Sequence, residues 1–571
     1  MTTRTTRPAP RLLTMGVAAT LALGLLGEGA AADVLAASAA TPSATATTTA
    51  TSARPATPRG LRIAPAAETV TAYAYDGYVY LDSPAWLAAY DEGYEFRAER
   101  ARPSGPVTLT KTVIRGRKRT TTTAPASIVD GLDGFRKGLS VQVATAQGTV
   151  LAKETRTLCL GGSERQRVQP TGRTEPVYPE FCGGNWFTRS TVSGVEQGWA
   201  ARIDGYFEVQ TTRKDLVLTM SISKPVAEFL GIPAGNRTLR QKVTVEDECE
   251  LFECGEVADQ LLGEPAEGFS TQADDARTDR AQALRAQGGA HGTHGAGPDA
   301  GPGAGHRVNL FTLRDGGQQH GDHPALGQAG TAPSSRRPAR DTLPDLVSAP
   351  AWQIGTEVDE AGTDRLTFNA NEWNAGPAPL VVEGYRRGAA EVMDAYQFFY
   401  RDGKEVGSTR TGSMKYHDAP EHDHWHFLDF ASYELVRPNG RLVTTSGKQS
   451  WCLAPTDPVD LSVPGAAWRP EATGLDSTCG DRSALWLREV LPVGWGDTYN
   501  QTQTQAFELT GVPNGTYRIR ITANPNGTLH ERTRSNNVSL RTVVLGGRPG
   551  ARTVQVPPYQ GVDTEVPEED Q

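Results

Sequence analysis

Three histidines separated by single residues, His422, His424 and His426, are the strongest sign of chemistry in this sequence. On a β-strand, the two-residue period puts all three side chains on one face. Neighbours on that face stand about 6.5–7 Å apart, so two imidazoles can reach one metal ion at about 2 Å from each ring nitrogen. A bend or bulge would bring in the third ring. Because the whole chain holds only 10 histidines, this spacing predicts a metal site.

The ligand type alone leaves the metal open. Neutral imidazoles bind copper, zinc, iron and nickel. With zinc, three histidines and one open coordination position would suit hydrolysis. His417 lies five residues before His422, and its place at or away from the metal stays open.

The elements that position these histidines are expected to be strands. Apolar and polar residues alternate over residues 216–222 and 517–521, and the second stretch follows the turn sequence Pro513-Asn514-Gly515. Aromatic and β-branched residues are interleaved with small and polar ones over residues 70–81. Long amphipathic helical patterns are scarce. These patterns predict a mainly β fold with tandem β-sandwich-like domains.

The chain of 571 residues is long enough for two such domains with linkers. A basic N-terminus, a short apolar run and then small residues indicate a secretory signal, because the run falls short of the ~20 residues that a spanning helix needs. Two stretches poor in large apolar residues read as linkers. The expected organisation is a secretory signal at 1–35, a low-complexity linker at 36–66, a β domain at 67–265, a disordered linker at 266–340, a second β domain at 341–548 and a C-terminal tail at 549–571.

The net charge and the cysteine content argue against nucleic-acid binding and against a thiolate metal site. The net charge of −9 provides no basic field for nucleic acid. The 6 cysteines are an even number, and an exported chain meets oxidising conditions, so three disulfides are expected. A thiolate metal site is disfavoured because the sequence has no CxxC pair.

An internal repeat links the two halves. The stretch that ends at Cys159 is similar to the stretch that ends at Cys452, and each continues to a second cysteine. Further on, Trp199 aligns with Trp495, and Phe207 with Phe507. The repeat suggests the disulfides Cys159–Cys182 and Cys452–Cys479.

The two copies differ where chemistry would be carried out. Ile203 stands in the first copy where the second has Tyr499, and Thr155 stands where the second has Lys448. The first half also has no histidine before His291. We therefore expect the first copy to be a non-catalytic partner or a binding module.

Several blocks of the second half resemble the lysyl oxidase family. The sequence HDHWHFLDFASYEL is similar to that family's copper motif, HxHxHSMDxFxxYxL. SGKQSWCL, GDTY and RSNNV resemble its GHKASFCL, YDTYG and DYTNNV blocks, and LPDLV resembles the start of its catalytic domain. These blocks run in order from about residue 341 to 545, whereas the WHxCH lead-in of the animal enzymes is absent. The resemblance is to a bacterial lysyl oxidase-like copper amine oxidase, with a degenerate copy in the first half.

The resemblance implies specific roles. His422, His424 and His426 would bind Cu(II). Lys448 and Tyr499 would form lysine tyrosylquinone, and Asp497 is our candidate general base, with a turn residue as the alternative. The implied reaction oxidises a primary amine, of a small molecule or a lysine-containing protein, with O2, and yields an aldehyde, H2O2 and ammonia.

Three functions follow from these observations. The first is a secreted, extracellular copper- and quinone-dependent amine oxidase, either free or associated with a cell wall or extracellular matrix. The second is a copper-binding or cell-surface-binding protein on the same scaffold without turnover. The third is a zinc hydrolase that uses the same histidines.

Overall fold

The computed structural model describes residues 60–247 and 338–565, apart from residues 76, 83–84, 163, 171, 204–205, 419–423, 448–449 and 501–504. We call residues 60–247 the first β region and residues 338–565 the second β region. The predicted signal, most of both predicted linkers, Cys249, Cys254, His422 and Lys448 lie outside the described residues. No helix in the described part is long and apolar enough to cross a membrane.

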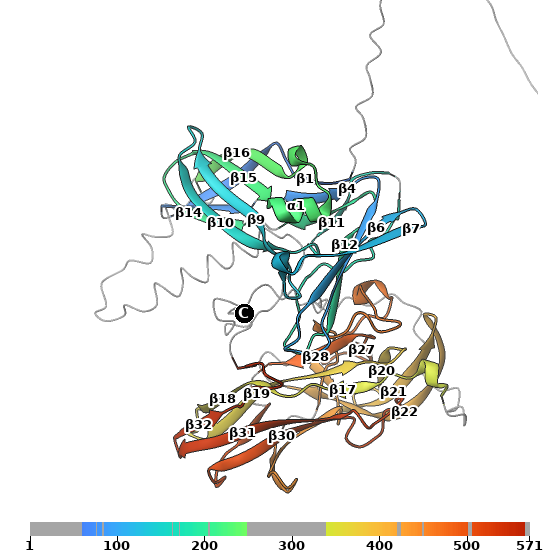
Figure 1. The fold of residues 1–571 in the computed structure, drawn as a ribbon. Coiled ribbons are helices and arrows are strands. Elements are labelled where there is room, and N and C mark those ends of the chain that lie inside the picture. The colour runs from blue at the N-terminus through green and yellow to red at the C-terminus, as the bar shows by residue number, and fades with distance from the viewer. Residues whose placement is uncertain are drawn as a thin grey trace, which may run out of the picture. The chain divides into compact units, whose positions relative to one another are not determined.

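The first β region consists of three sheets, coloured blue to green in Figure 1. One sheet has the strand order β1-β4-β13-β11, another β12-β5-β6-β7, and the largest β10-β9-β15-β16-β2-β3-β14 with β8 beside β9. Its elements are β1 Leu61–Pro65, β2 Thr69–Tyr75, β3 Tyr78–Asp82, β4 Ala85–Ala89, β5 Gly93–Glu99, β6 Thr108–Arg115, β7 Lys118–Thr123, η1 Ala126–Ile128, β8 Val129–Asp130, β9 Gly134–Thr145, β10 Val150–Leu158, β11 Arg165–Arg167, β12 Ser190–Val195, β13 Trp199–Ile203, β14 Tyr206–Gln210, β15 Asp215–Ile222, α1 Lys224–Leu230, η2 Ala234–Asn236 and β16 Thr238–Asp247.

The second β region also consists of three sheets, coloured yellow to red in Figure 1. Their strand orders are β17-β19-β28-β26 with β18 and β29 beside β19, then β23-β22-β21-β20-β27, then β25-β24-β30-β31-β32. Its elements are η3 Arg340–Thr342, β17 Leu346–Ser348, β18 Trp352–Val358, β19 Asp364–Asn374, β20 Leu380–Arg386, β21 Val392–Arg401, β22 Lys404–His417, β23 His424–Phe427, β24 Ala431–Val436, β25 Leu442–Thr445, β26 Asp457–Pro458, η4 Pro470–Ala472, β27 Trp486–Leu491, β28 Trp495–Tyr499, β29 Ala506–Glu508, β30 Gly515–Ala523, β31 Val538–Arg548 and β32 Ala551–Gln555.

The mainly β fold is confirmed, and the alternating patterns have the expected physical cause. In β15 every second residue is buried, as it is in β30, because successive side chains of a strand point to opposite faces. The stretch at 70–81 forms the hairpin β2–β3. Among the described residues α1 is the single α-helix, and it buries Val226, Ala227 and Leu230 in the core of the first β region.

Two predicted boundaries differ from the structure. Leu61–Pro65, which we assigned to the first linker, forms β1 and buries Leu61 and Ile63 in the core. Ala551–Gln555, which we assigned to a tail, forms β32 beside β31. Both segments are short, so their few apolar residues give little signal in sequence, although each completes the edge of a sheet.

The two disulfides suggested by the repeat are present. Cys159 pairs with Cys182, and Cys452 pairs with Cys479. The Cα atoms are 5.7 Å apart in both, within the usual range for a disulfide. The third pair lies outside the described residues.

The repeat also appears in strand order and register. The sheet β1-β4-β13-β11 has the same order as β17-β19-β28-β26. Leu61 pairs with Ala89 in the first sheet, as Leu346 pairs with Asn374 in the second. Strands β13 and β28 therefore hold equivalent positions.

Side chains of the two β regions contact one another. The Ser190 hydroxyl donates a hydrogen bond of 2.7 Å to the Asp460 carboxylate. The rings of Phe181 and Trp495 lie 5.3 Å apart, edge to face. Trp495 begins β28, so the first β region contacts the strand that ends at Tyr499.

Candidate functional site

The histidine-rich segment forms β23, which pairs with the end of β22. His424 lies opposite His417, and His426 lies opposite Lys415. The His424 and His426 rings share one face, with their Nε2 atoms 2.9 Å apart. The His417 ring stacks on the His426 ring at 5.3 Å between centroids. Three imidazoles thus gather at this edge of the sheet.

The geometry of His424 and His426 fits a shared metal ion. Two ligand nitrogens, each about 2.0 Å from one metal ion and at a right angle, are about 2.8 Å apart. The observed 2.9 Å is a hydrogen-bond distance between the two rings, and it is also close to the separation of two nitrogens that bind one metal ion. The described residues include no complete group of three or more ligands, and His422 lies outside them.

The backbone around β23 holds these rings in place. Phe427 and Trp451 exchange two backbone hydrogen bonds, of 2.7 and 3.0 Å. On the other side, the Trp425 amide donates to the Cys479 carbonyl at 2.9 Å. Trp425 itself is fully buried, and its indole donates to the Asp481 carbonyl. The alternation of His424, Trp425 and His426 thus puts the indole into the core and both imidazoles on the opposite face.

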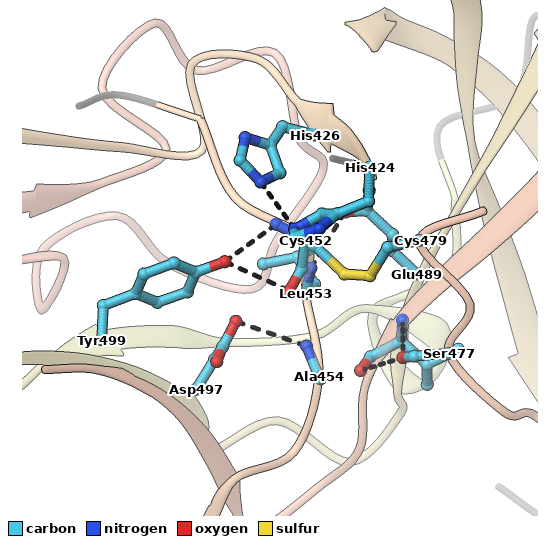
Figure 2. The surroundings of a disulfide bond; sticks show 11 residues. His424, His426, Cys452, Leu453, Ala454, Ser477, Cys479, Glu489, Asp497 and Tyr499 are labelled. Carbon is cyan, nitrogen blue, oxygen red and sulfur yellow. Dashed lines mark hydrogen bonds between the residues drawn. A yellow bond between two sulfur atoms is a disulfide. The ribbon is translucent and has the colours of Figure 1, made fainter. Parts of the chain in front are cut away.

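The segment from Ser450 to Cys452 connects the histidines with Tyr499. The Ser450 hydroxyl lies 3.4 Å from His426 Nδ1. The Trp451 ring packs against the Tyr499 ring, with centroids 4.1 Å apart. The Cys452 amide donates to the Tyr499 hydroxyl oxygen at 3.0 Å, and the Cys452 carbonyl lies 3.4 Å from the same atom. Figure 2 shows this tyrosine pointing at the Cys452 backbone, beside the Cys452–Cys479 disulfide.

Tyr499 lies at the end of β28 and is half-buried. Its cross-strand partner on β19 is Ala370. Burial, and then the negative charge of Asp497, raise the pKa of Tyr499 well above its usual value. The phenol is therefore neutral at physiological pH in the protein described here.

Asp497 lies two residues before Tyr499, in the interior of β28 and 1% exposed. It is a strand residue, so the alternative of a turn residue is wrong. Its carboxylate accepts a hydrogen bond of 3.3 Å from the Ala454 amide. Because the two positions are two residues apart on one strand, Asp497 and Tyr499 point to the same face of β28.

Two further buried acids, Glu372 and Glu489, surround Asp497, and sequence reasoning missed both. Glu372 on β19 is the cross-strand partner of Asp497. Glu489 on β27 accepts a hydrogen bond of 3.0 Å from the Leu453 amide. Burial, with the charge of Asp497, raises the pKa of each well above its usual value. Extending the repeat upstream would have flagged one of them, because Leu87 is the equivalent of Glu372.

The second β region thus brings converging imidazoles close to a half-buried tyrosine that is lined by buried acids. Residues 406–551 match the lysyl oxidase family model, so the C-terminal part of the chain carries a lysyl oxidase family domain. The resemblance of this part of the chain to the lysyl oxidase family is thus confirmed.

Similar proteins include lysyl oxidase homolog 2 of Mus musculus, 25% identical over 224 residues, which are 38% of this chain and 27% of that protein. The Rattus norvegicus homolog 2 is 26% identical over 202 residues, 35% of this chain and 24% of that protein. The Gallus gallus homolog 2 is 26% identical over 162 residues, 28% of this chain and 18% of that protein. The match therefore spans less than a third of each relative.

Proposed function

We propose that the second β region is a copper- and quinone-dependent amine oxidase. It would convert a primary amine, O2 and water into an aldehyde, ammonia and H2O2. The proposed copper ligands are His422, His424 and His426, and the proposed cofactor is lysine tyrosylquinone made from Lys448 and Tyr499.

One observation supports the proposal above all others. The segment Ser450–Cys452 contacts both His426 and Tyr499. Tyr499 is thereby held against the segment that begins two residues after Lys448, close to the imidazoles. A metal-assisted oxidation of the tyrosine ring, followed by attachment of the lysine, needs these groups in one place.

Different residues of this chain would hold the metal, orient the cofactor and transfer the proton. Lysine tyrosylquinone supplies the electron sink that no unmodified side chain provides. The imidazoles would hold the copper, and the Cys452 amide would fix the orientation of the ring oxygen at position 499. Asp497 would accept the proton from the carbon next to the amine. Trp451 packs against the ring at position 499 and would limit its movement.

Peroxide release tests this proposal. Copper-loaded full-length protein should release H2O2 with a panel of primary amines and a lysine-containing peptide. Lys448→Ala should abolish the release, whereas Lys404→Ala, at an exposed position on β22 of the same region, should retain it. Absence of peroxide from protein that binds copper would overturn the proposal and favour a copper-binding protein without turnover.

Metal analysis separates the zinc alternative. Protein purified without added metal and then offered equal copper and zinc should retain copper, and the His426→Ala variant should lose it. Retention of zinc together with hydrolytic activity would favour the hydrolase.

We further propose that the protein is secreted and that the first β region binds a cell wall, matrix or substrate without catalysis. The signal-like N-terminus and two disulfides support export. At the positions of Asp497 and Tyr499, the first region has Ala201 and Ile203, which supports a role without redox chemistry. Removal of residues 60–247 should reduce activity on macromolecular substrates more than on small amines.

A further inference from the structure

The fold does not require a buried acid at the position of Glu372. It lies on the central strand β19, is 0% exposed, and neither of its carboxyl oxygens has a hydrogen-bond partner among the described residues. Placing a carboxyl group there without a hydrogen bond or a cation is unfavourable. In the first β region, the equivalent strand position is Leu87, and the same strand order and register form around it.

The groups that face Glu372 are all acidic or neutral. On β28 its partner is Asp497, and on the other side its partner on β17 is Ser348. The Ser348 hydroxyl donates to the Asn537 carbonyl at 2.8 Å. The charge of Glu372 acts on Tyr499 and on Tyr433 of β24, and Glu489 of β27 faces Asp497. Among the described residues, Asp497 is the one charged group that acts on Glu372.

Directly paired residues on neighbouring antiparallel strands have Cβ atoms about 4.5–5.5 Å apart. Two carboxyl groups at that separation, both buried, do not ionise together, because like charges repel strongly where water is excluded. One proton between them removes most of this cost. It also gives Glu372 a donor that it can direct at the Asp497 carboxylate.

We propose that Glu372 and Asp497 form a carboxyl pair that holds one proton beside Tyr499, with Glu372 as a positioning residue that acts through Asp497. This inference deepens the proposed function and rests on it for the catalytic role of Asp497. When Asp497 accepts a proton from the amine substrate, the pair holds two protons, and loss of one to solvent restores the starting state. No electrons move in this step.

The first test of the pair does not need activity. The folded protein keeps Glu372 protonated well above the unfolded-state pKa of about 4.3. Its contribution to stability is therefore full below that pH and is lost as the pH rises. Glu372→Gln, which is neutral at every pH, should gain stability over wild type between pH 5 and pH 9. The gain expected in the unfolding temperature of the full-length protein is at least about 2–4 °C.

Two companion variants make the result specific. Glu372→Leu introduces the residue of the first β region and should follow the same trend. Glu383→Gln is the matched control, because Glu383 is equally buried but forms an ion pair of 2.8 Å with Arg488. This control should destabilise the protein across the range. If the difference in unfolding temperature between Glu372→Gln and wild type stays constant with pH, the two carboxyl groups do not share a proton.

The second test uses the pH dependence of kcat. Leucine cannot donate to Asp497, so in Glu372→Leu the acid side of the profile should move up by about one pH unit. Glutamine retains a donor and should restore the wild-type position. If the pH dependence of kcat in Glu372→Leu is the same as in wild type, Glu372 does not act as a positioning residue. If wild type oxidises no amine, the stability test still decides whether the pair exists, and the proposed function fails separately.

Discussion

Strands β13 and β28 hold equivalent positions in two similar sheets but carry side chains of different chemistry. Both begin with tryptophan and pair on both sides with equivalent neighbours. In β13 and its partner β4, the inward positions hold Ala201, Ile203 and Leu87. In β28 and β19 they hold Asp497, Tyr499 and Glu372. The apolar set stabilises a sheet, whereas buried carboxyl groups are costly there, and we propose that the acidic and aromatic set serves the reaction instead.

The largest effect expected from this comparison concerns Tyr499. Tyr499→Phe removes the phenol oxygen, without which the ring cannot be oxidised to the quinone, so amine-dependent peroxide release should fall at least about 10³-fold. The protein should still fold, with a loss of about 1 kcal/mol for the hydrogen bond from Cys452. Ile203→Val at the equivalent position should leave activity unchanged. Activity retained in Tyr499→Phe would contradict the assignment of the cofactor.

The second prediction concerns a substitution that places an acid in the first β region. Leu87→Glu puts a carboxyl group where Leu87 is 1% exposed and opposite Ala201, without a cation facing it among the described residues. We expect a loss of about 3–5 kcal/mol in the free energy of unfolding at neutral pH. The loss should grow as the pH rises above about 4.3, because burial raises the pKa of the new carboxyl group in the folded state. Calorimetry at pH 5 and pH 8 measures this, and equal losses at both values would contradict the account.

The third effect compares the two disulfides. Their cysteines are separated by 23 and 27 residues, so loss of either should cost about 3.5 kcal/mol by loop entropy. Replacing Cys452 and Cys479 by alanine should also lower kcat, because the Cys452 backbone holds the Tyr499 hydroxyl. Replacing Cys159 and Cys182 should change stability with little change in kcat. Equal effects of both replacements on kcat would contradict the claim that only the second β region carries the catalytic site.

Much of the fold follows from the sequence. The alternation at 216–222 and 517–521 predicts β15 and β30, because one face of each strand is buried and the other is not. The repeat predicts both observed disulfides. Local patterns did not identify β1 and β32, since short edge strands carry few buried residues.

The site was predicted in part. The alternating histidines were recognisable from type and spacing, whereas Tyr499 was singled out by the resemblance to the lysyl oxidase family. Glu372 was not, because nothing in its local sequence indicates that a residue 125 positions later in the chain lies opposite it. Asp497 follows a glycine, so a turn was a reasonable alternative until its place inside β28 was known. Cross-strand register is a tertiary property, and it assembles the acids around the tyrosine.

The central claim is that Lys448 and Tyr499 become one cofactor in the second β region. The most direct measurement is peptide mass spectrometry of the full-length protein after incubation with Cu(II) and O2, with metal-free protein alongside. The account predicts a cross-linked peptide that joins Lys448 to an oxidised Tyr499, dependent on copper and absent from Lys448→Ala. Copper-bound protein in which both residues remain unmodified and unlinked would contradict it.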